Sequence, residues 1–224
     1  YVMGTFPPGT RDFATYATVN EHFIAAHHAA VDVLRAGPGS FPVGWTLSMS
    51  DWSIEGDNQE ALDRTRMMHE GQFLEAARGD DYIGVQAYTR TRLSSEGLPL
   101  GPEDGVPVVT AMGYEVWPQA LAASVRYAAE KAQVPVYVTE NGMGTDDDEQ
   151  RIAYVHDSLD GLLRCIDDGI DVRGYFHWSL LDNFEWAEGY APRFGLVDVD
   201  RTTFARTPKP SAKWFGEIAR RNAL

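Results

Sequence analysis

Residues 134–142 read Val-Pro-Val-Tyr-Val-Thr-Glu-Asn-Gly, a short apolar run that ends in an acid and a turn. A run of this length that stops at Asn-Gly is typical of a buried strand in a parallel sheet. Glu140 then lies at the end of the strand, where the chain turns into a loop. Parallel α/β folds place their chemistry at this end of the strands, so Glu140 is a candidate catalytic residue. Without further context it could equally be structural.

A second segment of the same kind follows about forty residues later. Residues 176–186 read Phe-His-Trp-Ser-Leu-Leu-Asp-Asn-Phe-Glu-Trp, a strand that runs into an aromatic and acidic loop. Carboxylates accept hydrogen bonds from hydroxyl groups, and aromatic faces pack against apolar C–H surfaces. The two segments together favour a site that binds a sugar.

Helical and strand-like patterns alternate along the chain. We expect helices at residues 13–34, 58–77, 117–132, 150–168 and 211–222, and strands at residues 42–49, 82–88, 134–139 and 171–178. A loop rich in glycine and proline is expected from about residue 92 to 109, and a hairpin around residues 194–203. This alternation predicts an α/β fold with a parallel sheet and right-handed crossovers. Four strands are half of an eight-stranded barrel, which typically needs about 250 residues.

The composition excludes several classes of partner. The chain has 224 residues, 44% of them hydrophobic, and a net charge of −14, which argues against nucleic acid or an anionic membrane as partner. No apolar run approaches the roughly 18 residues of a membrane span, and the first residues lack a signal-peptide pattern. A cytoplasmic location is therefore expected.

Cysteine and histidine usage indicates neither a disulfide nor a metal site. Cys165 is the one cysteine and lies in a helical segment, so we expect a buried structural thiol. The six histidines show no spacing typical of metal ligands. We expect no metal and no cofactor.

These segments resemble the C-terminal half of glycoside hydrolase family 1 enzymes, the β-glucosidase family of (β/α)8 barrels. The resemblance covers essentially all 224 residues and is strongest from Met112 onward. Its most specific parts are residues 138–142 and 178–186, and the ending at residues 189–197 and 209–212 also fits. The resemblance implies a TIM-barrel-type fold in which residues 1–224 form a single domain. That domain would contain barrel strands five to eight with their helices.

The resemblance also implies roles for two residues at the centre of the site. Glu140 matches the catalytic nucleophile of a retaining glycosidase, which forms a covalent bond to the sugar. Such a carboxylate has to be ionised, so hydrogen-bond donors are expected near it. Tyr88 matches the family tyrosine whose hydroxyl holds this carboxylate.

Five further residues match positions that bind substrate in the family. Glu185 and Trp186 match the pair that binds sugar hydroxyls, and Trp178 matches the platform under the sugar ring. Phe194 matches the residue beside the hydroxymethyl group. Tyr114 lies where the family often has a tryptophan that lines the aglycone.

The sequence departs from the family pattern in three places. Gln86 and Ala87 stand where many relatives have asparagine and tyrosine, and we expect Ala87 to face the helices. The general acid/base of the family is a glutamate in an Asn-Glu-Pro motif on strand four, and these 224 residues contain no such motif. Residues 20–22 read Asn-Glu-His, but they lie in a helical segment and are expected to be helix surface.

Two hypotheses follow. The first is an enzyme, a retaining β-glycosidase and most simply a β-glucosidase, that hydrolyses O-glycosyl bonds of a small β-glucoside through Glu140. Its acid/base would come from an N-terminal half-barrel segment, another subunit or an unrecognised residue of this chain. The alternative is a non-catalytic, truncated half-barrel that binds sugar or self-associates through its unpaired strand edges.

Overall fold

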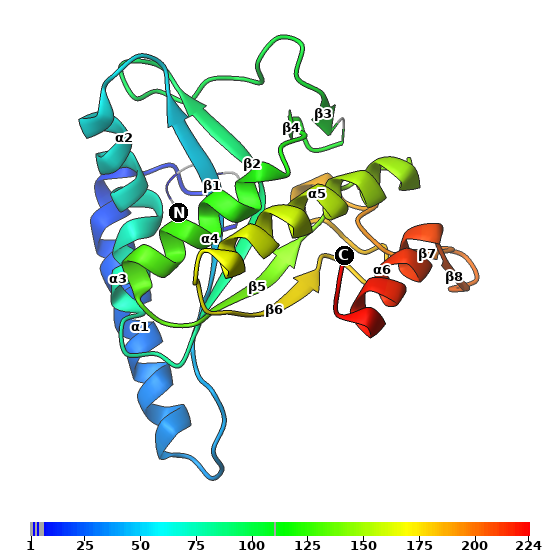
Figure 1. Cartoon of the computed structure of the whole chain (residues 1–224). Coiled ribbons are helices and arrows are strands. Elements are labelled where there is room, and N and C mark those ends of the chain that lie inside the picture. Colours follow the sequence, from blue (N-terminus) through cyan, green and yellow to red (C-terminus); the bar gives the residue numbers. More distant parts are fainter. Residues whose placement is uncertain (1, 3, 5–6, 110) are drawn as a thin grey trace.

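A four-stranded parallel sheet forms the centre of the molecule. The structure is a computed structural model that describes residues 2, 4, 7–109 and 111–224 (Figure 1). The sheet has the order β1-β2-β5-β6, and every neighbouring pair of strands is parallel. Its strands are β1 (Thr46–Ile54), β2 (Ile83–Leu93), β5 (Val136–Asn141) and β6 (Val172–His177). The prediction of a parallel α/β fold is therefore confirmed.

Two helices cover one face of this sheet. α4 (Gln119–Ala132) and α5 (Asp148–Asp167) lie side by side across it (Figure 1). The core between helices and sheet is aliphatic, and each fully buried side chain of this kind contributes roughly 1.5–3 kcal/mol. Its members include Val85, Leu121, Val125, Val138 and Leu162. The opposite face of the strands is thus the one left for a site.

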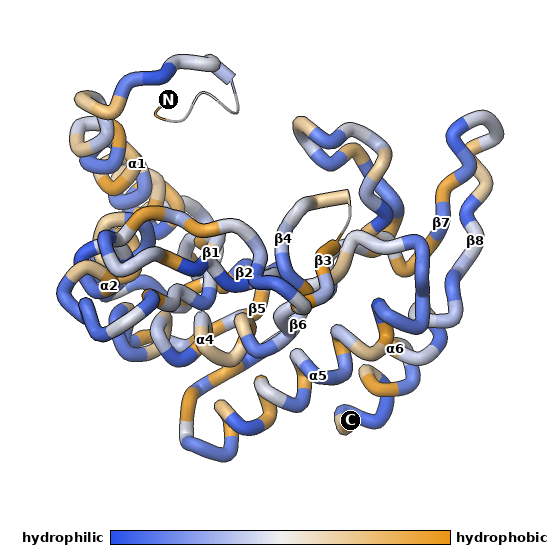
Figure 2. Tube along the Cα trace, turned by 90° about the horizontal axis from the view of Figure 1, so that it is seen from above, coloured by the Kyte–Doolittle hydropathy of each residue, from blue (hydrophilic) through white to orange (hydrophobic). Residues whose placement is uncertain are grey.

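The helix ends follow local capping rules. Asp147 caps α5, because its side chain accepts hydrogen bonds from the backbone N–H groups of Glu149 and Gln150. α4 ends at Ala132, and the capping residue that follows it, Gln133, adopts the left-handed conformation with φ 58°. α6 (Pro210–Arg221) begins with a proline at its first position and packs against α5. In Figure 2 hydrophobic and hydrophilic residues alternate along α5 and α6, as expected for helices with one buried face.

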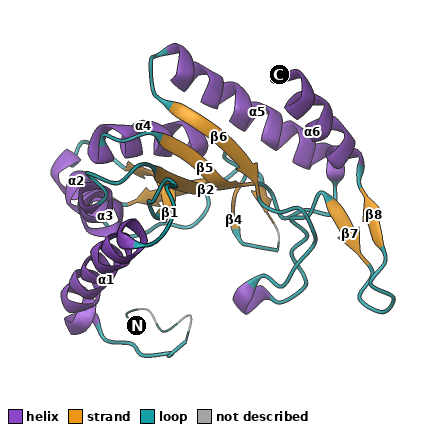
Figure 3. Cartoon of the chain, turned by 90° about the horizontal axis from the view of Figure 1, so that it is seen from below, coloured by secondary structure: helices purple, strands orange, loops and turns teal. Residues whose placement is uncertain are grey.

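The helices that precede β2 in the sequence lie beside β1, the edge strand of the sheet (Figure 3). They are the short 3-10 turn η1 (Phe13–Thr15), α1 (Tyr16–Ala36), α2 (Gln59–Arg66) and α3 (Gln72–Ala76). Between α2 and α3 lies a π-helical turn, η2 (Met67–Gly71). The single helix expected at residues 58–77 is therefore interrupted, because helical periodicity in a sequence does not distinguish an α turn from a π turn.

Several boundaries differ from the expected ones. β1 begins at Thr46 rather than at residue 42 and continues to Ile54, and β2 continues to Leu93 into the expected loop. The two strands extend together, since the pairing goes on past a register shift between Met49 and Asp51. Because the length of each strand depends on the strand that pairs with it, the local composition of either segment does not indicate where the pairing ends.

Two pairs of short antiparallel strands lie in the loops outside the main sheet. β3 (Val108–Val109) pairs with β4 (Tyr114–Glu115) beside the expected loop. β7 (Val197–Val199) pairs with β8 (Arg206–Pro208), so the hairpin expected at residues 194–203 lies further along the chain. The 3-10 turn η3 (Trp186–Glu188) lies in the loop that follows β6.

The sheet is open at both ends in the part of the chain that the structure describes. β1 and β6 each have a neighbour on one side only, which is the arrangement of a partial barrel. Phe176 on β6 is 59% exposed. No helix among the described residues is long and apolar enough to cross a membrane.

Candidate active site

Glu140 is the penultimate residue of β5, and two side chains of β2 hold its carboxylate. Tyr88 donates from its hydroxyl to Oε2 at 2.6 Å, and Gln86 donates from Nε2 to Oε1 at 2.7 Å. Gln86 pairs directly with Glu140 in the sheet, and Tyr88 follows two residues later on the same face of the strand. Burial, and then the neighbouring Glu140, raise the pKa of Tyr88, so its hydroxyl keeps the proton that it donates.

The residue after Glu140 locks the ends of three strands together. Asn141 is fully buried, and its amide donates to the carbonyl of Ala87 at 2.8 Å. The hydroxyl of Tyr175 on β6 donates to Oδ1 of Asn141 at 2.8 Å. On the other side, Tyr154 of α5 donates to the carbonyl of Tyr88 at 2.6 Å. These bonds fix the backbone on both sides of the Glu140 carboxylate.

Gly142 allows the segment that follows β6 to approach this point closely. The backbone N–H of Trp178 donates to the carbonyl of Asn141 at 2.8 Å. A Cβ atom at position 142 would lie 2.0 Å from the carbonyl oxygen of Trp178. Only glycine therefore permits the contact that brings Trp178 next to the end of β5.

Glu185 lies close to both Trp178 and Glu140. Burial raises the pKa of Glu185, a hydrogen bond from Trp178 lowers it, and the charge of Glu140 raises it further. Two carboxylates and an indole thus share one small region. Such a group can accept hydrogen bonds from hydroxyls and offer an aromatic face, which is the chemistry that carbohydrate recognition needs.

A buried ion pair anchors the loop that carries Glu185. Lys209 donates to Oδ1 of Asp182 at 3.0 Å and to the carbonyl of Gly195 at 2.7 Å. The backbone N–H of Gly195 donates to the same Asp182 oxygen at 2.8 Å. Both charged side chains are largely buried, with 15% of Lys209 and 6% of Asp182 exposed. Lys209, the residue before α6, therefore holds in place the loop after β6, which begins about thirty residues earlier in the chain.

The other expected site residues fall into two groups. Phe194 is buried and meets Tyr88 edge-on with 5.8 Å between ring centroids. Tyr114 lines a pocket together with Tyr88. Burial, and then the neighbouring Tyr154 and Glu185, raise the pKa of Tyr114. Trp186 differs, because it lies in η3 with 71% of its surface exposed. Its role in binding a sugar hydroxyl stays a prediction.

Some residues of the site were not singled out from the sequence. Gln86 was noted only as a departure from the family pattern, although its spacing of two from Tyr88 places both on one strand face. Nothing local indicated that Asn141 or Lys209 would anchor the site. The expectation that Ala87 faces the helices is confirmed, because Ala87 is buried on the helix side. Glu21 and His22 are exposed on α1, whereas Asn20 is buried with 7% of its surface exposed, so the expectation that residues 20–22 are helix surface is wrong for Asn20.

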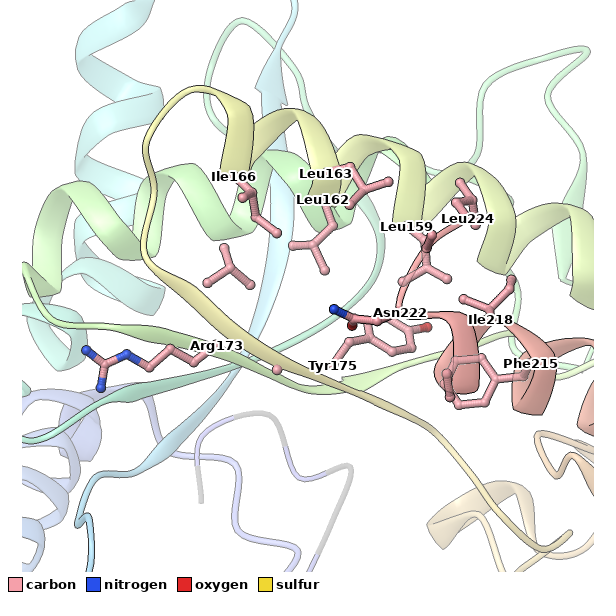
Figure 4. Close-up of a pocket in the computed structure, with 14 residues that line it drawn as sticks. Leu159, Leu162, Leu163, Ile166, Arg173, Tyr175, Phe215, Ile218, Asn222 and Leu224 are labelled. Atoms are coloured by element: carbon pink, nitrogen blue, oxygen red, sulfur yellow. The ribbon is translucent and has the colours of Figure 1, made fainter.

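Other features lie apart from this region. A cavity of about 470 Å³ opens between α5, β6 and α6 and is largely apolar (Figure 4). Its lining includes Leu159, Leu163, Tyr175, Phe215 and Ile218. Cys165 is buried in the core below it, as expected for a structural thiol. Among the residues that the structure describes, no cluster of three or more His, Cys, Asp or Glu could hold a metal ion.

The parallel sheet, its helices on one face and its polar residues at the carboxyl ends of the strands define part of an α/β barrel. Residues 101–224 match the family model of glycosyl hydrolase family 1. The chain belongs to this family.

Three relatives support the assignment. A β-glucosidase of Agrobacterium sp. is 32% identical over 98% of this chain and 58% of its own length. A solved β-glycosidase, BGL167, is 45% identical with a TM-score of 0.86, over 96% of this chain and 51% of its own. The β-glucosidase of Thermotoga maritima, solved in complex with noeuromycin, is 26% identical with a TM-score of 0.89, over 100% of this chain and 60% of its own. The chain therefore spans between half and two thirds of the length of these relatives.

Proposed function

We propose that the protein acts as a retaining β-glycosidase, specifically a β-glucosidase, with Glu140 as its nucleophile. The observation that carries this proposal is the pair of donors on Glu140, because Tyr88 and Gln86 each bond to a different carboxylate oxygen. Donors of this kind favour the ionised form of a carboxylate. An ionised carboxylate at the end of a barrel strand is suited to attack an anomeric carbon.

The reaction proceeds in two displacements. In the first, an oxygen of Glu140 bonds to the anomeric carbon while the bond from that carbon to the leaving-group oxygen breaks. The leaving oxygen takes a proton from a general acid. In the second, water attacks the same carbon, loses a proton to that group and frees Glu140.

The neighbouring residues bind the sugar during both steps. Glu185 accepts hydrogen bonds from two adjacent hydroxyls, and Trp178 packs under the ring. Trp186 donates its indole N–H to a hydroxyl, Phe194 lies beside the hydroxymethyl group, and Tyr114 faces the aglycone. The hydrogen bond between Glu185 and Trp178 and the electrostatic interaction of Glu185 with Glu140 support this arrangement.

The general acid belongs to an N-terminal half-barrel that pairs with β1 and β6. These two strands lack a second neighbour among the described residues, and edge strands present unpaired N–H and C=O groups. The greater length of the relatives supports a partner of this kind. The whole 224-residue chain then acts as one domain of the barrel, and a cytoplasmic location stays a prediction.

Trapping of the covalent intermediate tests the assignment of Glu140. A β-glucoside with fluorine at C2 and a good leaving group needs little acid assistance and leaves a long-lived adduct. We expect mass spectrometry to place the fluoroglucosyl group on the peptide that contains Glu140. Glu140→Gln should remove the label, whereas Glu217→Gln, at an exposed position of α6, should retain it.

The experiment is done on this chain alone and with the N-terminal half-barrel added. A label on another residue, or no label in either preparation, would contradict the proposal. A second copy of this chain as partner would be recognised by its mass in sedimentation.

A further inference from the structure

Arg151 is a buried cation that the mechanism above does not use. It lies near the start of α5, and only 1% of its surface is exposed. A charge that is taken out of water costs free energy, and pairing with an opposite charge often does no more than offset this cost. The stability of the fold therefore gives little reason for an arginine at this position, and its contacts have to explain it.

The two terminal nitrogens of Arg151 have different partners. Nη1 donates to Oδ1 of Asp148, three residues earlier on the same helix. Nη2 donates to the backbone carbonyls of Thr145 and Arg193, the latter at 2.6 Å. The carbonyl of Arg193 also accepts from the backbone N–H of Thr145 at 3.2 Å. The ion pair with Asp148 explains Nη1, whereas Nη2 joins the loop that follows β5 to the loop that follows β6.

Phe194, the residue after Arg193, is packed at this junction with 2% of its surface exposed. Its carbonyl accepts from the backbone N–H of Ser179 at 3.2 Å. A Cβ atom at position 144 would lie 2.9 Å from Cε2 of the ring, so Gly144 lets the ring pack directly on the loop after β5. The backbone that Arg151 holds therefore sets the position of the Phe194 ring.

This ring packs against the tyrosine that orients Glu140. Phe194 meets Tyr88 edge-on with 5.8 Å between ring centroids, and the Tyr88 hydroxyl donates to Oε2 of Glu140 at 2.6 Å. Tyr154, three residues after Arg151, donates to the carbonyl of Tyr88 at 2.6 Å. Residues three apart share one face of a helix. One face of α5 thus holds the backbone of Tyr88 directly and its ring through Phe194.

We propose that Arg151 is a positioning residue for the first displacement: through the backbone of residues 193 and 194 it keeps Phe194 against Tyr88, so that the Tyr88 hydroxyl stays aligned with Glu140. Arg151 itself does not touch the sugar. A hydrogen bond weakens steeply as its geometry departs from the favoured one, so a small shift of the ring is enough to matter. This inference rests on the proposed function, in which Glu140 is the nucleophile.

The kinetics of Glu140 labelling test the inference. The rate at increasing concentrations of the 2-fluoroglucoside gives separately the affinity for the reagent and the rate constant of attack at saturation. Arg151→Lys keeps a positive charge near Asp148 but loses the planar fork that reaches both carbonyls. We expect the rate constant of attack to fall about three- to tenfold, with the affinity unchanged.

A merely structural role gives a different result. Partial unfolding lowers the final amount of label but leaves the rate constant of the folded molecules as it was. Arg164→Lys is the matched control, because Arg164 lies on the same helix in an exposed ion pair with Asp160. It should leave both the affinity and the rate constant unchanged.

A double variant tests the route through Tyr88. Tyr88→Phe has no hydroxyl to align, so adding Arg151→Lys to it should leave its rate constant unchanged. If the two substitutions instead multiply their separate effects, Arg151 acts by another route and the inference is overturned.

Gly144→Ala disturbs the same ring without altering Arg151. Its Cβ would press on Phe194 from the loop after β5, so we expect a slower attack with unchanged affinity. This variant decides the question if Arg151→Lys fails to fold. An unchanged rate constant in Gly144→Ala would show that the position of Phe194 does not matter for Tyr88, and the role of Arg151 would fall with it.

The outcomes separate this inference from the proposed function. Label on Glu140 with equal rate constants in Arg151→Lys and the unchanged protein overturns the role of Arg151 alone. A loss of affinity for the reagent with an unchanged rate constant does the same. No label on Glu140 in the unchanged protein overturns the proposed function, and this inference with it.

Discussion

Tyr88 and Glu140 lie on neighbouring parallel strands, and the hydroxyl of Tyr88 donates a 2.6 Å hydrogen bond to Oε2 of Glu140. Gln86 donates to the other carboxylate oxygen from the same strand. Because alternate residues of a strand project to one face, β2 alone supplies both donors. The carboxylate is therefore held in orientation through both of its oxygens, and each donor can be tested separately.

Removal of the Tyr88 hydroxyl should slow the attack of Glu140. Tyr88→Phe keeps the ring that packs against Phe194 but loses a bond to a charged group, which is worth about 1.5–3 kcal/mol. We expect the rate of Glu140 labelling to fall by about 10- to 100-fold. Tyr82→Phe, before the start of β2, is the matched control. Equal labelling rates for Tyr88→Phe and the unchanged protein would refute the role of this hydroxyl.

Gln86 should be sensitive to the length of its side chain. Gln86→Leu removes the donor to Oε1 of Glu140, and we expect a loss of about tenfold in the labelling rate. Gln86→Asn retains the amide on a shorter arm and should not restore the rate. Full activity of Gln86→Asn would show that the 2.7 Å bond is not required.

Gly142→Ala should destabilise the junction between β5 and β6. The added Cβ would lie 2.0 Å from the carbonyl oxygen of Trp178, so the backbone has to move. We expect a loss of about 3 kcal/mol or more in the free energy of unfolding, measured with urea. Gly101→Ala is the control, because a Cβ there meets nothing within 4 Å. Similar losses for the two variants would count against a specific steric conflict.

Lys209→Met should weaken the loop that carries Glu185. It leaves the largely buried charge of Asp182 without its partner, and breaking such a pair costs about 3–5 kcal/mol. The same variant should bind glucose more weakly, because Glu185 loses its support. Adding Asp182→Asn to Lys209→Met should recover part of the stability. A double variant no more stable than Lys209→Met would refute the coupling.

His177 should make the stability of the protein depend on pH. Burial lowers the pKa of His177 from the 6.5 that is usual for histidine to about 4. The unfolded chain therefore binds a proton before the folded one does, so stability is fully present above about pH 6.5 and is lost as the pH falls towards about 4. The full difference amounts to about 3 kcal/mol.

Paired unfolding measurements isolate this contribution from that of the carboxylates. We expect His177→Gln to flatten the stability profile between about pH 6.5 and 4. His156→Gln, at an exposed position of α5, should leave the profile unchanged. Parallel profiles for His177→Gln and the unchanged protein would contradict the assignment.

The parts predicted well are those with a local cause. The apolar run before Glu140 predicts a buried strand that ends at the acid, and β5 ends one residue later at Asn141, so the position of the carboxylate follows from adjacent residues. The boundaries of β1 and β2 were wrong because both strands extend through mutual pairing. Trp186 could be matched by its motif, but its exposure depends on how η3 turns.

The sequence by itself determined the parallel α/β order, the strand-end location of Glu140 and the resemblance that names Tyr88 as its partner. The tertiary structure alone decided that Gln86 holds the second oxygen, that Lys209 anchors the Glu185 loop and that Arg151 holds the carbonyl of Arg193. The physical reason is the separation in the sequence between the residues that interact. Apolar periodicity and turn residues act between near neighbours, whereas these bonds join residues 54, 27 and 42 positions apart, whose meeting depends on sheet order and helix geometry.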